Sequence, residues 1–382
     1  KALVERCDVI GWDKCSMLAA LEPYRTVEIC NQAGQYVDTL IYGMRKDGDG
    51  KNLFISHVQD CYRRRVDKEE HYQITLRGEF APTVMDTHTG EMYPMPAEYR
   101  EGNTVLYWDC YSQSSLLLRL EPGRCEFTKP AAAPVGEESY LTGEAELILH
   151  EPNVCVLDMA RWKIDDGDWQ PAEEMTCIGV AAKKALDFSI GAIHGAQPWV
   201  FKTEPPKNTL TVEMTFVSDV EIEEAELALE DFAESEILFN GRKIEKNPAG
   251  YYVDFSITRV PIGKIEKGVN TVVVTKPFSV ISNTENMFVL GDFGVDVTGS
   301  EVRLTAPARR ITFGDWTRQG LAFYGGAATY RFQIEGGKDT ELRLGLFSAP
   351  CVTVELDGRR VANVSLAPYS AKLGRLSEGT HT

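Results

Sequence analysis

The strongest constraint on the fold of this chain is an alternation of apolar and polar residues, with a period of two, between residues 25 and 122. This period places successive side chains on opposite faces of a strand, so that one face is buried. The pattern predicts strands at residues 26–30, 39–44, 53–58, 72–76, 83–85, 104–108 and 115–120. Turn sequences such as Asp47-Gly48-Asp49-Gly50 separate them. We therefore expect residues 25–122 to form one compact antiparallel β domain.

Helical patterns are short and few. Residues 1–24 carry apolar side chains at helical spacing, and we expect them to finish a domain that lies upstream. A second helix is predicted from Pro171 to about Phe188. Proline is favoured in the first turn of a helix, and Lys183-Lys184 suit its C-terminal end, where the helix dipole attracts positive charge.

An approximate internal repeat connects two distant parts of the chain. Residues 236–244 resemble residues 352–361, and residues 262–271 resemble residues 373–382. Each unit is a predicted strand, a tight Asx-Gly turn, a second strand and, later, a glycine turn into a closing strand. Two copies of one β-sandwich architecture explain this pattern. We expect the second copy to lose its final strand where the sequence stops, and the chain to be a piece of a longer polypeptide.

Composition excludes several classes of function. With 57 acidic and 40 basic side chains, the formal net charge is -17. This disfavours nucleic acid and anionic membranes as partners, because both select clustered Lys and Arg. No apolar run reaches the roughly 18 residues that a membrane-spanning helix needs. The nine cysteines form no C-x-x-C pair and the six histidines show no metal-ligand spacing, so we interpret the cysteines as reduced thiols of a cytoplasmic protein and predict no metal site.

One segment resembles a motif of a known family. Residues 314–326, with the sequence Gly-Asp-Trp-Thr-Arg-Gln-Gly-Leu-Ala-Phe-Tyr-Gly-Gly, run on into Thr329-Tyr330-Arg331-Phe332. They resemble the W-x-x-Q-G-x-x-x-Y-x-G…Y-R pattern of the sugar-binding jelly-roll domain in glycoside hydrolase family 2 and its relatives. The sequence departs from that pattern at Ala322, where the family has proline.

Further segments strengthen the resemblance by their order along the chain. They are residues 86–91, 96–100, 150–158, 196–199 and 290–295, the strand–turn–strand around Asp357-Gly358, and residues 368–379. Together they are similar to the C-terminal half of large bacterial proteins described as family 2-like or α-L-rhamnosidase-like glycoside hydrolases. In such enzymes the catalytic carboxylates lie on a (β/α)8 barrel that precedes these domains. Since the sequence shows no barrel pattern, the resemblance implies an accessory region beside an upstream catalytic domain.

The predicted fold class is mainly β, with several antiparallel β-sandwich or jelly-roll domains of the galactose-binding-like kind and one or two short helices. Residues 1–24 are expected to end an upstream domain, and residues 25–122 to form the antiparallel β domain. Residues 137–298 are expected to form a β-sandwich with an inserted helix. Residues 299–382 are expected to form a galactose-binding-like jelly roll that is truncated at its C-terminal end.

The resemblance implies a carbohydrate contact in the loop that carries the motif. Sugars stack their apolar C–H faces on aromatic rings and form hydrogen bonds through their hydroxyl groups. The candidate carbohydrate-binding residues are Asp315, Trp316, Arg318, Tyr324, Trp199 and Gln197. The alternative is that Trp316 and Tyr324 pack the core of the jelly roll while the glycines of the motif shape the loop.

Other polar clusters are interpreted as structural. Residues 219–236 carry nine acids and no base, which is typical of a solvated strand face, with a metal ion or cationic partner as the alternative. The run Asp47-Gly48-Asp49-Gly50 lacks the further ligands of an EF-hand loop and is predicted to be a hairpin turn. The run Asp165-Asp166-Gly167-Asp168 is typical of a turn, with a calcium site beside a Trp169 sugar platform as the alternative. No nucleophile or nucleotide-binding motif is found, so no catalytic residue and no cofactor is predicted.

The predicted function is a non-catalytic, carbohydrate-contacting region of a bacterial glycoside hydrolase, with α-L-rhamnosides among the candidate substrates of the parent enzyme. The expected partners are carbohydrate, the upstream catalytic domain and, in a homo-oligomer, a second copy of the chain. Two alternatives stay open. A stand-alone carbohydrate-binding module predicts affinity for a free glycan, whereas a purely structural or oligomerisation role predicts a large buried patch between chains and no such affinity.

Overall fold

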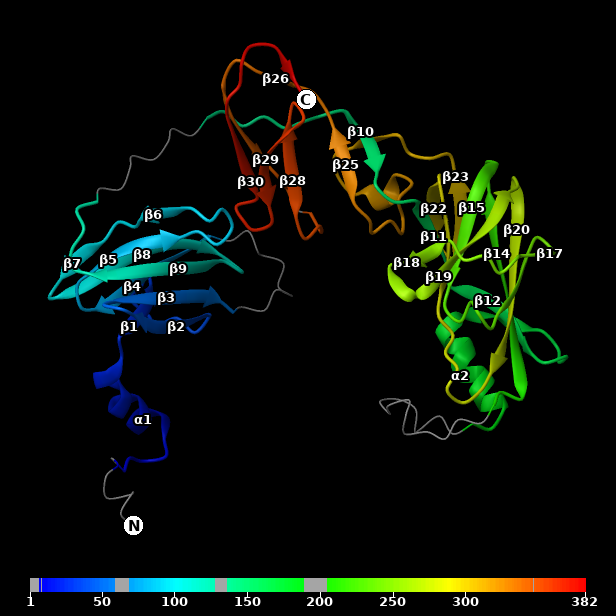
Figure 1. The fold of residues 1–382 in the computed structure, drawn as a ribbon, viewed down its shortest axis with the longest axis horizontal. Helices are drawn as coiled ribbons and strands as arrows, with labels where there is room; N and C mark the ends of the chain where they lie inside the picture. The colour runs from blue at the N-terminus through cyan, green and yellow to red at the C-terminus, as the bar shows by residue number, and fades with distance from the viewer. Residues whose placement is uncertain (1–6, 8, 59–68, 128–135, 189–204, 346) are drawn as a thin grey trace. The chain divides into compact units, whose positions relative to one another are not determined.

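The computed structural model describes residues 7, 9–58, 69–127, 136–188, 205–345 and 347–382. Contacts between Cα atoms divide the chain into two units, which we call unit one (Lys1–Glu137 with Gln333–Thr382) and unit two (Glu138–Phe332). Both are built mainly from antiparallel strands, and the described residues contain two short α-helices (Figure 1). The mainly-β fold class predicted from the sequence is confirmed.

The first part of unit one is a sandwich of two antiparallel sheets, with strand orders β1-β4-β8-β7 and β2-β3-β9-β5-β6. The predicted strands are present, and β6 and β7 are additional short ones. The strands are β1 (Val27–Asn31), β2 (Leu40–Asp47), β3 (Gly50–His57), β4 (Glu69–Arg77), β5 (Phe80–Met85), β6 (Met92–Pro94), β7 (Glu98–Arg100), β8 (Asn103–Tyr111) and β9 (Ser115–Pro122).

Strand register brings the apolar faces of this sandwich together. Leu53 on β3 pairs with Leu118 on β9, and Ile55 pairs with Leu116. Directly opposite residues lie on the same face of a sheet, so all four side chains enter one core, where they are buried. The period-two pattern therefore predicts both the strands and their inward face.

The turn between β2 and β3 is the predicted hairpin. Asp47 pairs with Gly50 across it, and Gly48 has a φ of +60°. Nη1 of Arg119 donates a hydrogen bond to Oδ2 of Asp47 at 2.7 Å. The Asp47 carboxylate thus ties the hairpin to the neighbouring strand β9.

Helix α1 (Lys14–Leu21) is shorter than the predicted helical segment, and a 3-10 turn, η2 (Glu22–Tyr24), follows it. Asp13 is its N-cap, since Oδ1 accepts a hydrogen bond from the backbone N of Ser16 at 2.9 Å. An aspartate cap starts a helix at the next residue, which explains why residues 9–12 are not helical. Residues 1–6 and 8 of the predicted helix lie outside the described residues. No residue of α1 is buried.

Unit two contains a larger sandwich. One sheet has the order β13-β12-β14-β20-β16-β17, with β23 on the end of β14 and β22 paired with β23, and the other has the order β11-β21-β15-β19-β18. A separate sheet has the order β24-β10-β25. The strands are β10 (Glu144–Leu149), β11 (Asn153–Leu157), β12 (Met159–Ile164), β13 (Gln170–Glu174), β14 (Asn208–Ser218), β15 (Ile222–Leu229), β16 (Glu236–Phe239), β17 (Arg242–Lys243), β18 (Gly250–Tyr252), β19 (Asp254–Ile265), β20 (Gly268–Phe278), β21 (Met287–Gly291), β22 (Gly294–Thr298), β23 (Glu301–Thr305), β24 (Arg310–Thr312) and β25 (Ala328–Arg331).

The two large sheets of unit two share one core. Phe216 of β14 and Phe239 of β16 stack with ring centroids 6.5 Å apart, and Leu227 of β15 and Val289 of β21 meet them from the other sheet. All four side chains are buried. The predicted boundary between residues 298 and 299 falls in the tight turn between β22 and β23, whose strands are paired with each other.

Helix α2 (Met175–Ala185) begins later than predicted. Pro171 lies in β13, the edge strand beside β12, and Glu174 is the N-cap, accepting a hydrogen bond from the backbone N of Cys177 at 3.1 Å. Proline is tolerated on an edge strand, so strand pairing overrides its preference for a helix start. The predicted Lys183-Lys184 C-terminal end is confirmed. Neither α1 nor α2 has the length and apolar character that crossing a bilayer requires, within the described residues.

The remaining strands belong to residues 333–382 of unit one. They are β26 (Ile334–Glu335), β27 (Asp339–Arg343), β28 (Val352–Leu356), β29 (Arg359–Val364), β30 (Ser370–Arg375) and β31 (Thr380–His381). β28 and β29 form the predicted hairpin around Asp357-Gly358, and β16 and β17 form its counterpart around Asn240-Gly241. Both central residues of each turn have positive φ, as a type I′ hairpin requires.

The close packing of α2 predicts that replacing one of its glycines with alanine lowers stability, although alanine is the better helix former. A Cβ on Gly179 would overlap Oγ1 of the buried Thr284. Helix propensity favours alanine over glycine by about 1 kcal/mol, whereas overpacking costs about 1–3 kcal/mol. We expect Gly179→Ala to lower the free energy of unfolding of unit two, measured by urea denaturation.

The control for this experiment is Val180→Ala, an exposed position of the same helix where stability should be unchanged or slightly raised. Adding Thr284→Ala to Gly179→Ala should recover most of the loss, because it removes the overlapping hydroxyl. A Gly179→Ala protein more stable than the unmodified chain would contradict the packing of α2 against Thr284.

Candidate functional site

The loop that carries the predicted sugar motif lies between β24 and β25 and is closed by the Gln319 side chain. Oε1 of Gln319 accepts hydrogen bonds from N and Oγ1 of Thr312, both at 2.9 Å. Its Nε2 donates to the carbonyl oxygens of Thr312 and Asp315 at 3.2 and 3.1 Å. These bonds bring the two ends of residues 312–319, which we call the aromatic loop, close together. The glutamine of the motif therefore has a structural role.

Gly320 attaches the aromatic loop to the sandwich. Its carbonyl oxygen accepts hydrogen bonds from the backbone N of Val295 at 2.8 Å and from Nδ2 of Asn153 at 2.9 Å. Gly320 has a φ of +85°, a conformation that favours glycine. Gln319 and Gly320 of the motif thus fix the loop rather than face a ligand.

Trp316 and Tyr324 pack on a small core formed with Leu147, Ile311 and Leu321. Their rings meet edge to face, with centroids 5.9 Å apart. Tyr324 is 5% exposed, its hydroxyl donates to the carbonyl oxygen of Ala327 at 2.6 Å, and burial raises its pKa. These contacts are the ones expected from the packing alternative.

Asp315 and Arg318 lie at the exposed side of the same loop. Asp315 caps the 3-10 turn η5 (Trp316–Arg318), where Oδ1 accepts hydrogen bonds from N and Oγ1 of Thr317 at 3.0 and 2.6 Å. These bonds hold the pKa of Asp315 below its usual range. Nε of Arg318 lies 3.9 Å from Oδ2 of Asp315, and the Arg318 side chain is 89% exposed. A carboxylate and a guanidinium are therefore presented to solvent side by side.

The structure thus brings four of the predicted residues into one loop region: Asp315, Trp316, Arg318 and Tyr324. Gln197 and Trp199 lie outside the described residues, and their role as carbohydrate contacts stays a prediction.

The aromatic loop also carries Phe313, a residue that the sequence analysis did not single out. The Phe313 ring lies 6.1 Å from the Tyr330 ring and 5.2 Å from the Phe332 ring, centroid to centroid, the second contact being edge to face. Phe313 is 38% exposed. Its position in the sequence could have indicated Phe313. It follows directly after the end of β24 and precedes Gly314, so its side chain is free to leave the sheet.

The acidic run 219–236 is a charged strand face, as predicted. Several of its carboxylates pair with basic side chains, many of them on neighbouring strands. The pairs are Asp219 with Arg303, Glu221 with Lys264, Glu226 with Arg259, Asp231 with Lys276 and Glu236 with Lys243. Ala225, Leu227 and Leu229 alternate with these residues and are buried. The bases in these pairs all come from outside the run.

The run of acids at residues 165–168 is the predicted turn, between β12 and β13. The Asp165 carboxylate accepts hydrogen bonds from the backbone N of Thr209 and from Nδ2 of Asn208, both at 2.7 Å. The Trp169 ring lies under the guanidinium of Arg161, with the Arg161 Cζ 4.6 Å from the ring centroid. Asp165 thus ties the turn to β14, and Arg161 covers one face of the ring that was considered as a sugar platform.

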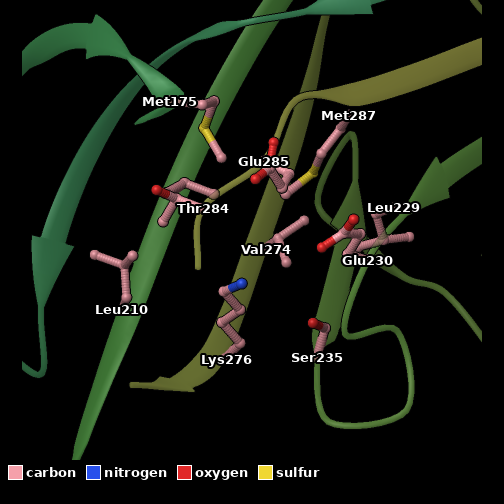
Figure 2. Close-up of a pocket in the computed structure, with 11 residues that line it drawn as sticks. Met175, Leu210, Leu229, Glu230, Ser235, Val274, Lys276, Thr284, Glu285 and Met287 are labelled. Atoms are coloured by element: carbon pink, nitrogen blue, oxygen red, sulfur yellow. The ribbon is translucent and has the colours of Figure 1, made fainter. Parts of the chain in front are cut away.

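A pocket in unit two combines apolar walls with three charged groups. Its walls come from both sheets of the sandwich and from α2, and Glu230, Lys276 and Glu285 line it as well (Figure 2). Desolvation raises the pKa of Glu230, and the charges of Glu285 and Asp231 raise it further. Nζ of Lys276 donates to Oδ2 of Asp231 at 2.8 Å. Because its lining comes from segments far apart in the chain, no sequence motif predicts this pocket.

Glu69, His71 and Asp109 form a group whose ligand atoms lie within 4.8 Å of one another. His71 on β4 pairs directly with Asp109 on β8, and Nδ1 of His71 lies 2.8 Å from Oδ1 of Asp109. This hydrogen bond raises the pKa of His71. All three residues are exposed, and the contact between His71 and Asp109 is that of a cross-strand pair on the solvent face.

The raised pKa of Glu230 predicts a stability change with a definite pH dependence. A carboxyl whose pKa is higher in the folded than in the unfolded state destabilises the fold when it is ionised, and this penalty disappears as the pH falls below its unfolded pKa of about 4.3. We expect Glu230→Gln to raise the melting temperature at pH 7 and to have little effect at pH 4. Glu234→Gln, an exposed control from the same acidic run, should change the melting temperature little at either pH. A lower melting temperature of Glu230→Gln at pH 7 would contradict the burial of this carboxyl.

No protein-family model and no curated protein matches this chain. Solved structures with distant similarity include a rhamnosidase from Novosphingobium sp. PP1Y, 13% identical over 72% of this chain and 26% of that chain, with a TM-score of 0.23. A GH31 alpha-xylosidase from Xanthomonas citri is 9% identical over 75% of this chain and 35% of that chain, with a TM-score of 0.17. An exo-beta-1,3-galactanase from Phanerochaete chrysosporium is 8% identical over 67% of this chain and 58% of that chain, with a TM-score of 0.15. The chain therefore spans 26% to 58% of these proteins, and the TM-scores are too low to carry their activities over to it.

Proposed function

We propose that this chain is a non-catalytic, carbohydrate-contacting region of a glycoside hydrolase, and that the aromatic loop makes the contact. The observation that carries the proposal is the combination of side chains on this loop. Phe313 exposes an aromatic ring, and Arg318 exposes a guanidinium beside the Asp315 carboxylate. The resemblance of residues 314–326 to the sugar-binding motif supports the same surface.

Each of these groups has a part in sugar binding that follows from its chemistry. The Phe313 ring offers an apolar face to the C–H groups of a pyranose. Arg318 donates hydrogen bonds to hydroxyl oxygens, and the ionised Asp315 accepts them from hydroxyl groups. Gln319 holds the two ends of the loop together before any ligand binds, which reduces the entropy lost on binding.

The chemistry of the loop supports a binding role rather than a catalytic one. Glycoside hydrolysis needs a carboxylic acid that keeps its proton near neutral pH, facing a second carboxylate across the sugar. The pKa of Asp315 is lowered instead, so this carboxyl is ionised and accepts hydrogen bonds. We infer that the catalytic pair belongs to a separate domain of a longer protein of the family 2-like or α-L-rhamnosidase-like kind.

A second candidate role, as a contact surface for another protein domain, is favoured by the apolar side chains of α1 and the segment before it. Trp12 is 96% exposed, and Leu18 and Leu21 are more than half exposed. Contiguous exposed apolar side chains are typical of protein-interaction surfaces. This surface is the one that we propose for the upstream catalytic domain.

The proposed site predicts a loss of sugar affinity in variants that stay folded. Phe313→Ala should weaken the binding of a free glycoside about three- to tenfold, because an aromatic contact contributes about 0.5–1.5 kcal/mol. Arg318→Ala should weaken it by a similar factor through lost hydrogen bonds. Affinities are measured by titration calorimetry with a panel that includes methyl α-L-rhamnoside and methyl β-D-galactoside, and melting temperatures are recorded for each variant.

Phe255→Ala is the matched control, since Phe255 is 82% exposed on β19 of the same unit but is not part of the aromatic loop. It should leave the affinity unchanged. Unchanged affinity of both loop variants, at an unchanged melting temperature, would exclude the aromatic loop as the contact. No affinity of the unmodified chain for any glycoside would favour the structural role, and hydrolysis of aryl glycosides by this chain would contradict the non-catalytic assignment.

A further inference from the structure

A histidine and two carboxylates converge on the sandwich in the first part of unit one, where strands β4 and β8 pair. His71 lies directly opposite Asp109 in the register of this pair, and Glu69 precedes His71 by two residues on β4. Residues that are directly opposite, or two apart on one strand, share a face of the sheet. The backbone pairing therefore holds three side chains with metal-ligating atoms on the same face.

This face of the strand pair is turned to solvent. The three side chains are exposed, whereas Tyr72 and Cys110, which point to the opposite face, are 6% and 1% exposed. Among the described residues, the pair also has no neighbouring strand at this point, since β1 ends opposite Tyr72 and β7 pairs only with residues 103–105 of β8. An ion can therefore reach the three side chains from solution without a change in the core.

The distances between the ligand atoms suit one metal ion. One ligand atom from each of the three side chains lies within 4.8 Å of the other two, and Nδ1 of His71 lies 2.8 Å from Oδ1 of Asp109. Ligand atoms that bind a tetrahedral zinc ion at about 2.0–2.2 Å lie about 3.3–3.6 Å from one another. Rotation of exposed side chains covers the difference, so that an ion takes the place of the hydrogen atom between His71 and Asp109.

The charge of the two carboxylates is not balanced by lysine or arginine. Elsewhere in this sandwich, Asp47 pairs with Arg119 at 2.7 Å. In the part of the chain that the structure describes, Glu69 has no ion pair, and Asp109 pairs with His71 alone. Like charges held together on one sheet face repel each other. A divalent cation between them removes this repulsion.

We propose that Glu69, His71 and Asp109 form a binding site for a divalent transition-metal ion of the zinc class. Imidazole and carboxylate groups together suit Zn²⁺, whereas Ca²⁺ and Mg²⁺ select oxygen ligands. Because the chain supplies three ligands, a further coordination position is open to water. The bound ion joins β4 to β8 where this pair has no neighbouring strand. The site is independent of the aromatic loop and of carbohydrate binding.

The proposal departs from the expectation of no metal site, which rested on spacing within single segments of the sequence. His71 and Asp109 are 38 residues apart, and only the pairing of β4 with β8 makes them neighbours. A search for ligands at short, regular spacing therefore does not find this group.

The test is a calorimetric titration of the whole chain with zinc chloride, after a chelator has removed bound metal. Exposed thiols are first blocked with iodoacetamide, because cysteine also binds zinc. The variants are His71→Ala, which removes the imidazole, and Asp109→Asn, which keeps the shape of the side chain but removes its charge. Melting temperatures recorded without zinc show that each variant is folded.

The matched control is His88→Ala. His88 is an exposed histidine of the same sandwich that follows Asp86 by two residues, as His71 follows Glu69. Oδ1 of Asp86 accepts a hydrogen bond from the backbone N of His88 at 2.8 Å, and this pair is not part of a three-ligand group. The control thus separates a converging set of ligands from an exposed histidine beside an acid.

We expect one zinc ion to bind per chain, and both site variants to weaken this binding at least about tenfold, since even the loss of an outer-shell partner has such an effect. His88→Ala should bind zinc as tightly as the unmodified chain. In the unmodified chain, zinc should also slow the modification of His71 by diethyl pyrocarbonate, measured by mass spectrometry, and leave that of His88 unchanged.

Unchanged zinc affinity of the folded His71→Ala and Asp109→Asn chains would overturn the proposal. The absence of saturable binding at millimolar zinc would overturn it as well. If a site variant does not fold, the protection of His71 in the unmodified chain decides the question, and equal modification of His71 with and without zinc contradicts the site. Calcium binding as tight as that of zinc would contradict the assignment to the zinc class.

Discussion

The antiparallel pairing of β14 with β20, from Asn208 opposite Phe278 to Ser218 opposite Gly268, is the interaction on which unit two depends. Strand β12 adds to the outer side of β14, and β16 adds to the outer side of β20. A slip of one residue would turn every inward side chain of the slipped strand toward solvent. The register of this one pair therefore decides which residues of four strands reach the core.

The position of the aromatic loop follows from the same pairing. Strand β23 pairs with the end of β14, and β22 pairs with β23. Val295 of β22 then donates its backbone N–H to Gly320 at 2.8 Å, and the buried Asn153 donates to Gly320 and to Phe293. A buried amide without partners costs about 1–3 kcal/mol, so these bonds are maintained whenever the core is formed. The exposed ring of Phe313 and the guanidinium of Arg318 are thus carried by a loop that the core itself positions.

Strand patterns and turn chemistry could be predicted from the sequence because both are local. Period-two alternation marks the strands, and the matched Asx-Gly dipeptides mark turns whose φ values agree in the structure. The start of α2 could not be predicted in this way, because the pairing of β13 with β12 competes with the helix signal of Pro171. Nor could the pocket around Glu230, whose charged groups come from separate strands and loops. The sequence also could not show which residues of the motif fix the loop and which are exposed. This depends on tertiary hydrogen bonds, such as those of Gln319.

The charge arrangement bears on the kind of ligand that the aromatic loop would suit. Although the chain has a net charge of -17, much of the acidic run is neutralised by bases on neighbouring strands, so this run is not a field of free carboxylates. On the loop itself, the charges of Asp315 and Arg318 offset each other at 3.9 Å. A neutral ligand loses little by entering such a surface, whereas an anionic ligand meets the overall negative charge and a cationic one must displace Arg318 from the carboxylate. A neutral polyhydroxylated molecule with an apolar face satisfies the ring, the donor and the acceptor together, which is the chemistry of a neutral pyranose.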